Sequence, residues 1–142
     1  MTISKYNAER YYDPTAYEAL TRIEREERIS QYRPLVYICS PYAGDVDRNV
    51  AAARRYSRIA LELGCIPLAP HLLFPQFLDD RNEEERALGL RFGNILMDKC
   101  AELWVFGSRI SSGMEAEIKR AGRKGYPVRY FTEGGTEYVP EN

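Results

Sequence analysis

Apolar residues along this chain gather in short runs that alternate with stretches of helical periodicity. Short apolar runs bounded by turn residues are typical of buried strands, and here they cover residues 35–39, 65–69, 102–106 and 128–131. Between the runs, apolar positions recur every three to four residues, as on one face of a helix, over residues 47–63, 82–100 and 112–125. Pro67 inside the second run predicts an edge or strand-end position, because proline cannot donate a ladder hydrogen bond.

This alternation predicts an α/β fold, because strands joined through helices pair in parallel with right-handed crossovers. We expect a three-layer, doubly wound sheet of the flavodoxin- or Rossmann-like kind, with mainly parallel strands and helices on both faces. Residues 1–33 differ from the rest: they are charged and rich in tyrosine, and Asp13-Pro14 is a typical helix start. The sequence therefore predicts an N-terminal helical arm over residues 1–33 and one α/β domain over 34–142.

Residue types at the ends of the predicted helices indicate where each one begins. Asn82 with Glu85, and Ser112 with Glu115, have the spacing of a capping box. The segment over residues 70–75 is predicted to be a loop, and the tail that follows the last apolar run shows no periodicity.

Composition then narrows the classes of function. The chain has 142 residues with 20 basic and 21 acidic side chains, so it lacks the basic excess of proteins that bind nucleic acid polymers. No apolar stretch approaches membrane-spanning length, and the polar N-terminus does not resemble a signal peptide. With one histidine and no CxxC pair, we expect neither a zinc site nor another cofactor. We interpret Cys39, Cys65 and Cys100 as reduced core thiols of a cytoplasmic protein.

Three loops follow the carboxyl ends of the predicted strands, where ligands bind in doubly wound sheets. They span residues 40–45, 70–72 and 107–113 and hold the single histidine, several hydroxyls and flexible glycines. None contains the GxGxxG dinucleotide pattern or the GxxxxGK[ST] phosphate loop. Each also has a structural interpretation, since the first loop could be a plain turn, His71 a structural histidine and Tyr37 a core tyrosine.

The segment 111–118 contains two glutamates, and a structural role is evident for one of them. Glu115 lies three residues after Ser112 and is accounted for by the capping box. Glu117 has no such role, and at about 100° per residue it lies closer than Glu115 to the apolar face of the helix. Because a helix start favours anions, we expect the Glu117 carboxylate to stay ionised and to be capable of acting as a nucleophile.

Three blocks of the sequence are distinctive: Val36-Tyr37-Ile38-Cys39-Ser40-Pro41-Tyr42, the stretch from Gly64 through Pro67 to Pro70-His71, and Ser111-x-Gly113-x-x-x-Glu117-Ile118-x-x-Ala121. Together they resemble the nucleoside 2-deoxyribosyltransferase-like superfamily, which includes deoxynucleoside 5′-monophosphate N-glycosidases. The resemblance covers about residues 35–131 and is strongest to a branch of short domains with YICSPYAGD and PLAPHLLFP blocks. It implies cleavage of the N-glycosidic bond between base and deoxyribose, with a glutamate attacking the anomeric carbon.

The resemblance also implies a role for individual residues. Glu117 matches the nucleophile and Tyr37 the tyrosine that positions it. Where the family has an aspartate near the leaving base, this chain has Asn94, with Asp98 one turn later; asparagine can hydrogen-bond a base but cannot act as a general acid. The residues expected against the substrate are Ser40, Pro41, Tyr42, Ala43, Gly44, His71, Ser111, Gly113 and Met114. Among these, Ser111 and Gly113 match the contacts of a 5′-phosphate.

Two functions of different classes remain open at this point. One is a hydrolase or transferase, an N-glycosidase or 2-deoxyribosyltransferase acting on a small-molecule nucleoside or nucleotide. The other is a catalytically inactive nucleotide-binding module of the same fold, which Asn94 favours. The resemblance further implies a homo-oligomer, a dimer or higher. Aromatic residues are enriched in interfaces, so the tyrosines of the N-terminal arm are a candidate contact surface: Tyr6, Tyr11, Tyr12, Tyr17 and Tyr32.

Overall fold

The computed structural model describes residues 14–30 and 32–141, and the contacts divide the chain into two compact units, residues 1–33 and 34–142. In the first unit, helix α1 spans Pro14–Ser30, so the predicted helix begins where proline fits best. The Thr21 hydroxyl donates a hydrogen bond to the carbonyl of Tyr17 at 2.8 Å. The predicted interface residues Tyr6, Tyr11 and Tyr12 lie outside the described residues.

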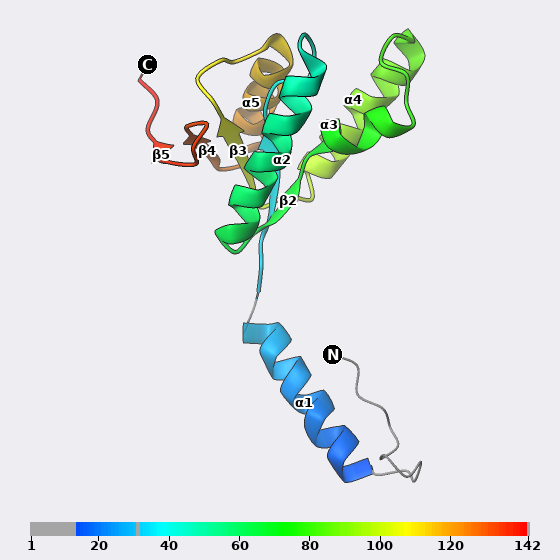
Figure 1. Ribbon diagram of the computed structural model, residues 1–142, viewed down its shortest axis with the longest axis vertical. Helices are drawn as coiled ribbons and strands as arrows, with labels where there is room; N and C mark the ends of the chain where they lie inside the picture. Colours follow the sequence, from blue (N-terminus) through cyan, green and yellow to red (C-terminus); the bar gives the residue numbers. More distant parts are fainter. Residues whose placement is uncertain (1–13, 31, 142) are drawn as a thin grey trace. The chain divides into compact units, whose positions relative to one another are not determined.

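The second unit is built on a five-stranded sheet (Figure 1). Its strands are β1 (Leu35–Cys39), β2 (Ile66–Leu68), β3 (Glu102–Phe106), β4 (Val128–Phe131) and β5 (Glu137–Tyr138). They lie in the order β2-β1-β3-β4-β5, and all neighbours are parallel except β4 and β5. The strand β2 with Pro67 is at an edge, as predicted. The mainly parallel α/β fold is thereby confirmed.

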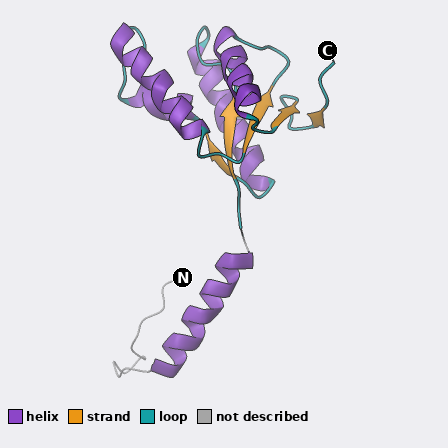
Figure 2. Ribbon diagram, turned by 180° about the vertical axis from the view of Figure 1, so that it is seen from behind, coloured by secondary structure: helices purple, strands orange, loops and turns teal. Residues whose placement is uncertain are grey.

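Helices cover the sheet on both faces, and Figure 2 shows the strands between them. The longer helices are α2 (Val46–Glu62), α4 (Glu83–Met97) and α5 (Ser112–Lys124). On one face, Tyr56 and Ala60 of α2 pack on strand residues that include Ile38, Trp104 and Phe106. On the other face, Met97 of α4 and Met114 and Ala121 of α5 pack on the alternate strand positions, which include Tyr37, Cys39 and Val105.

Alternation along β1 explains why neighbouring residues of one strand serve different faces. Successive side chains of a strand point to opposite sides, so Val36 and Ile38 enter the α2 cluster while Tyr37 and Cys39 enter the α4–α5 cluster. All four are at most 4% exposed. The prediction of a fully buried strand here is confirmed.

Two segments depart from the sequence-based prediction. The expected loop over residues 70–75 contains a short helix, α3 (Pro70–Leu73), and a 3₁₀ turn, η1 (Phe74–Gln76). Each begins with a proline near its start, which presets the helical φ. The tail that lacked periodicity contributes β5, because the backbone turns at Gly135 (φ 93°) and pairs antiparallel with β4. A two-residue strand is too short for any periodic signal.

The start of α5 is a further correction. Its N-cap is Ser111, whose hydroxyl accepts a hydrogen bond from the Met114 amide at 3.2 Å. Ser112 is instead the first helical residue, so the predicted capping pair of Ser112 and Glu115 is wrong. Glu115 forms an exposed ion pair with Lys119 at 3.0 Å. Among the described helices, none is long and apolar enough to cross a membrane.

Candidate active site

Glu117 lies over the carboxyl end of β1, where two strand side chains meet its carboxylate. Tyr37 and Cys39 are two residues apart on the same face of the strand. The Tyr37 hydroxyl donates a hydrogen bond to the Glu117 carboxylate. The Cys39 thiol lies 3.7 Å from Glu117 Oε1 and 3.9 Å from the carbonyl oxygen of Met114. The structure thus brings together the residues predicted to be nucleophile and positioning tyrosine, and adds a thiol.

Burial decides the charge state of this cluster. It raises the pKa of Glu117 from 4.5 to about 7, although the hydrogen bonds from Tyr37 and Cys39 act in the opposite direction. The carboxylate therefore ionises at a higher pH than its place near the helix start suggests. The helix dipole acts mainly within the first turn, and Glu117 is the sixth residue of α5. Burial also raises the pKa of Tyr37 and of Cys39 well above their usual ranges, so both remain protonated donors.

Cys39 is the contact that sequence reasoning missed. All three cysteines are free and buried, as the interpretation of core thiols predicted. Cys39, however, also faces a carboxylate. The Tyr-x-Cys spacing indicates it, because residues i and i+2 of a strand share a face and the resemblance pairs Tyr37 with Glu117.

The first turn of α5 presents backbone amides at the same edge of the sheet. The Ser111 hydroxyl serves as the N-cap of α5, and the Ser111 backbone amide contacts the Met114 sulfur at 3.5 Å. The amides of Ser112 and Gly113 occupy the first two helical positions, which have no intrahelical acceptor. Gly113 is exposed, whereas the Met114 side chain is only 1% exposed and belongs to the core. An anion at this edge would therefore meet the amides around Gly113 rather than the Met114 side chain.

Ser40 and His71 form a second polar pair at the ends of β1 and β2. Their Oγ and Nε2 atoms are 2.8 Å apart, and Ser40 is 6% exposed. The register that pairs Tyr37 with Leu68 brings these two strand ends together. Burial lowers the pKa of His71 to about 4, so the imidazole is neutral at physiological pH.

The loop after β1 is held to helix α2. Asn49 donates from Nδ2 to the carbonyl oxygens of Tyr42 and Ala43, each at 3.0 Å. Pro41 and Tyr42 are partly buried, whereas Ala43 and Gly44 are exposed. Gly44 has φ 98°, a conformation that favours glycine at this turn. Tyr42 lines a surface hollow together with residues 75–81, Val46 and Glu85.

The two polar residues predicted on α4 do not contact Glu117. Asp98 forms an ion pair with Arg120 at 3.0 Å and accepts a hydrogen bond from the Tyr126 hydroxyl at 2.7 Å. These partners lower the pKa of Asp98 to about 2, so it is no source of protons near neutral pH. Asn94 is exposed. Gly93 of α4 faces the cluster, since an added Cβ there would lie 3.4 Å from the Tyr37 hydroxyl oxygen.

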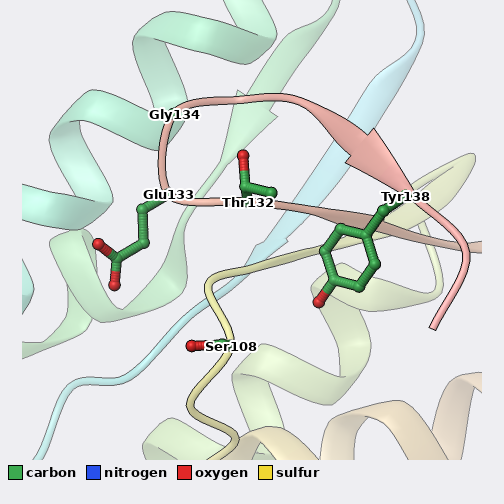
Figure 3. Close-up of a pocket in the computed structure, with 5 residues that line it drawn as sticks. All are labelled: Ser108, Thr132, Glu133, Gly134 and Tyr138. Atoms are coloured by element: carbon green, nitrogen blue, oxygen red, sulfur yellow. The ribbon is translucent and has the colours of Figure 1, made fainter. Parts of the chain in front are cut away.

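A separate hollow of about 520 Å³ lies beside the ends of β3 and β4 (Figure 3). Its lining residues are Ser108, Thr132, Glu133, Gly134 and Tyr138. Ser108 belongs to the predicted ligand-binding loop 107–113, but none of the five was singled out as a site residue. The Glu133 carboxylate points away from Tyr138. Within the described ranges 14–30 and 32–141, no group of three or more His, Cys, Asp or Glu side chains has a geometry that could hold a metal ion.

Comparison with known proteins agrees with this architecture. A solved structure of the 2-deoxyribosyltransferase from the psychrotolerant bacterium Bacillus psychrosaccharolyticus, characterised as a biocatalyst for nucleoside synthesis, superposes with a TM-score of 0.60. The match covers 75% of this chain and 77% of that chain at 15% sequence identity, so the likeness is one of fold. No curated protein matches the chain in sequence.

The family comparison covers the same unit as the sheet. The model of a domain of unknown function, DUF7768, matches residues 34–131. This range contains β1 to β4, the Tyr37–Cys39–Glu117 cluster and the Ser40–His71 pair. The chain therefore belongs to the DUF7768 family, and its α/β fold is that of a 2-deoxyribosyltransferase.

Proposed function

We propose that this protein cleaves or transfers at the N-glycosidic bond of a nucleoside or nucleotide, with Glu117 as the nucleophile. The observation that carries the proposal is the Glu117 carboxylate itself, held by the Tyr37 hydroxyl and the Cys39 thiol at the carboxyl end of β1. A largely buried carboxylate with a perturbed pKa at a ligand-binding edge is a typical feature of a functional site. The fold shared with a 2-deoxyribosyltransferase supports the same chemistry.

The proposed reaction proceeds in two steps. The ionised Glu117 carboxylate attacks the anomeric carbon as the bond to the base breaks, which gives a glycosyl-enzyme intermediate. Water or a second base then displaces Glu117 from that carbon, so the configuration is retained overall. Tyr37 and Cys39 keep the carboxylate oriented as neutral hydrogen-bond donors, because both stay protonated.

Residues at the same edge of the sheet provide the proposed substrate contacts. We assign the loop of residues 40–44 and His71 to the sugar and base, and the α5 start around Ser111 and Gly113 to a 5′-phosphate. Amides that lack intrahelical acceptors support the phosphate assignment. The neutral His71 and the Ser40 hydroxyl support recognition of polar groups by hydrogen bonds rather than by charge.

One observation favours a second candidate function, a nucleotide-binding module without catalysis. Asp98 is neutralised by Arg120, and in the described part of the chain no second carboxyl contacts Glu117. Glycosidases generally use a pair of carboxyl groups, one of which protonates the leaving group. A base that leaves without a protein acid departs more slowly, so a protein of this design could bind its ligand without turnover.

An assay of base release separates the two functions. The full chain is incubated with a panel of deoxynucleosides and deoxynucleoside 5′-monophosphates, and the free base is measured by chromatography. The glycosidase proposal predicts release from at least one substrate, with loss of activity in Glu117→Gln by a factor of about 10³ or more. Added acceptor base that appears in a new nucleoside identifies a transferase, and its absence a hydrolase.

The matched control is Glu115→Gln, which neutralises an exposed glutamate of the same helix that pairs with Lys119. It should retain base release. Ligand binding without release in wild type establishes the binding module instead. Neither binding nor release across the panel would refute both proposals.

A further inference from the structure

The imidazole of His71 is held through one ring nitrogen and open at the other. Its Nε2 atom lies 2.8 Å from the Ser40 hydroxyl oxygen, and among the described residues the ring makes no other hydrogen bond. In residues 14–30 and 32–141, every fully buried side-chain nitrogen or oxygen has a hydrogen-bond partner. Nδ1 has none, so it is not fully buried. The partly buried ring therefore presents Nδ1 to solvent or to a ligand.

The Ser40 hydroxyl determines which ring nitrogen of His71 carries the hydrogen. A hydroxyl has one hydrogen to donate and can also accept through its lone pairs. Ser40 is 6% exposed, and within the described part of the chain its side chain bonds to His71 alone. A buried donor without an acceptor costs free energy, so the hydroxyl donates to Nε2. The imidazole is neutral at physiological pH, and its one N–H is therefore on Nδ1.

This Nδ1–H group lies at the same edge of the sheet as the Glu117 carboxylate. Ser40 directly follows Cys39, whose thiol is 3.7 Å from Glu117 Oε1. The register of β1 with β2 brings the start of α3, and with it His71, beside the end of β1. His71 makes no hydrogen bond to Glu117 in the described structure. A nucleoside with its anomeric carbon at Glu117 extends its base away from that carbon, along the loops of this edge.

We propose that the Nδ1–H group of His71 donates a hydrogen bond to an exocyclic oxygen of the base, so that the substrate carries an oxo base: uracil, thymine, hypoxanthine or guanine. The oxygen meant is the one that cytosine and adenine replace by an amino group. The proposal rests on the proposed function and names its substrate class. An amino group at that place sets N–H against N–H and leaves both donors unpaired, which disfavours adenine and cytosine.

The same hydrogen bond assists the departure of the base. As a Glu117 oxygen bonds to the anomeric carbon, the bond from this carbon to the base nitrogen breaks and its electron pair stays on the base. The resulting negative charge is shared between ring nitrogens and the exocyclic oxygen, where a fixed donor stabilises it. The Nδ1 hydrogen stays on His71, and the base takes a proton from water after it leaves. His71 thus stabilises the leaving group without acting as an acid.

Nitrogen NMR of the imidazole tests the tautomer on the full wild-type chain, without a substrate. His71 is the only histidine in the sequence, so its two ¹⁵N signals are unambiguous, and their couplings to the ring protons assign each nitrogen. Near neutral pH we expect the hydrogen on Nδ1. Ser40→Ala removes the hydroxyl that donates to Nε2, and should shift the population toward Nε2–H. A wild-type imidazole with its hydrogen on Nε2 would overturn the proposal.

Matched substrates test the hydrogen bond itself. Deoxyinosine and deoxyadenosine, and likewise deoxyuridine and deoxycytidine, carry an oxo or an amino group at the same place. The kcat/KM of base release should favour the oxo member of each pair roughly a hundredfold. His71→Asn can place an amide N–H at the position of Nδ1 and should keep a preference. His71→Gln places its amide at the position of Nε2 and should lose it.

The control Leu73→Ala alters a side chain of α3 that is 46% exposed, and should keep the wild-type preference. Far-UV circular dichroism confirms that each variant is folded. Equal kcat/KM within each substrate pair, or the same ratio in His71→Asn and His71→Gln, would overturn the role of His71. Base release that is lost in Glu117→Gln would still leave the glycosidase proposal in place.

A protein that releases no base is tested by binding instead. Titration calorimetry of wild type with the same substrate pairs should then show tighter binding of the oxo member, and His71→Gln should abolish the difference. That result supports the assignment of His71 while the glycosidase proposal fails. Equal affinities within each pair, or no binding of any member, would overturn the inference.

Discussion

At the residue scale, the hydrogen bond from Cys39 to Glu117 influences the charge state of the carboxylate. A thiol is a weak hydrogen-bond donor, so Cys39 orients the Glu117 carboxylate while withdrawing little of its charge. A hydroxyl at the same place would donate more strongly and stabilise the ionised form further. The pKa of Glu117, about 7 in the folded protein, is then sensitive to the group at position 39 in both directions.

Substitutions of Cys39 should therefore move the Glu117 pKa in opposite directions. Cys39→Ala removes the donor and should raise it, and Cys39→Ser should lower it, each by about half a unit. The measurement is a pH titration of the glutamate carboxyl carbons by ¹³C NMR, with the Glu117 signal assigned by its loss in Glu117→Gln. Cys100→Ala is the control, since Cys100 donates to the Leu96 carbonyl at 3.4 Å. Equal shifts of the same sign in both variants would indicate a packing effect alone.

The raised pKa of Glu117 also has a consequence for stability. A carboxyl with a pKa of 4.5 when unfolded and about 7 when folded binds more protons in the folded state between these values. Stability gained from protonation is therefore complete below pH 4.5 and is lost as the pH rises through 7. Above pH 7 the folded protein holds a buried charge that the unfolded chain exposes to water.

Replacement of Glu117 by glutamine removes this pH-dependent cost. Relative to wild type, Glu117→Gln should gain on the order of 2–3 kcal/mol in free energy of unfolding between pH 5 and pH 8. Urea denaturation at the two pH values measures it. The exposed Glu115→Gln should show a change within about 0.5 kcal/mol at both. A stability difference between wild type and Glu117→Gln that is independent of pH would mean that the carboxyl is not buried enough to shift.

At the element scale, the position of the α5 cap is decided by one hydroxyl. The Ser111 side chain accepts the Met114 amide, and removal of an N-cap hydroxyl typically costs about 1 kcal/mol. Ser111→Ala should therefore destabilise the protein by about that amount, whereas Ser112→Ala should change stability by less than about 0.5 kcal/mol. Thermal or urea unfolding of the two variants compares them directly. The reverse order would place the cap at Ser112.

This shift of one residue illustrates what local sequence can and cannot specify. Periodicity located β1, β3 and the three long helices, because burial of a face repeats over many residues. The choice between Ser111 and Ser112 as the cap depends on how the preceding loop enters the helix, and both serines have the right chemistry. The strand β5 depends on its partner β4, which no local pattern encodes.

The site shows the same division between local and tertiary information. Glu117 and Tyr37 could be paired by resemblance, and their contact is present. The ion pair of Asp98 with Arg120 joins residues 22 positions apart along the chain, so its effect on the Asp98 pKa depends on how α4 packs against α5. The high pKa of Glu117 likewise results from burial in the folded structure. Its position near the helix start alone predicts a low pKa.

At the scale of the whole molecule, ligand binding should appear as a gain in thermal stability. A ligand that binds only the folded state stabilises it by about 2.7 kcal/mol at 100 times its dissociation constant. For a domain of this size, that corresponds to a rise in Tm of roughly 5–10 °C. We expect this rise with a deoxynucleoside 5′-monophosphate and a smaller one with the matching deoxynucleoside, because only the first reaches the amides at the α5 start.

Glu117→Gln makes this measurement independent of turnover. The variant cannot form the glycosyl intermediate, and it lacks a negative charge near the bound phosphate, so its rise in Tm should equal or exceed that of wild type. Differential scanning fluorimetry with both ligands, at a pH near 8 where Glu117 is ionised in wild type, compares the two proteins. A rise confined to wild type would mean that the stabilising species is a covalent intermediate or a product. Equal rises in Tm with nucleoside and monophosphate would refute the assignment of a 5′-phosphate to this site, because the α5 amides would then contribute nothing to affinity.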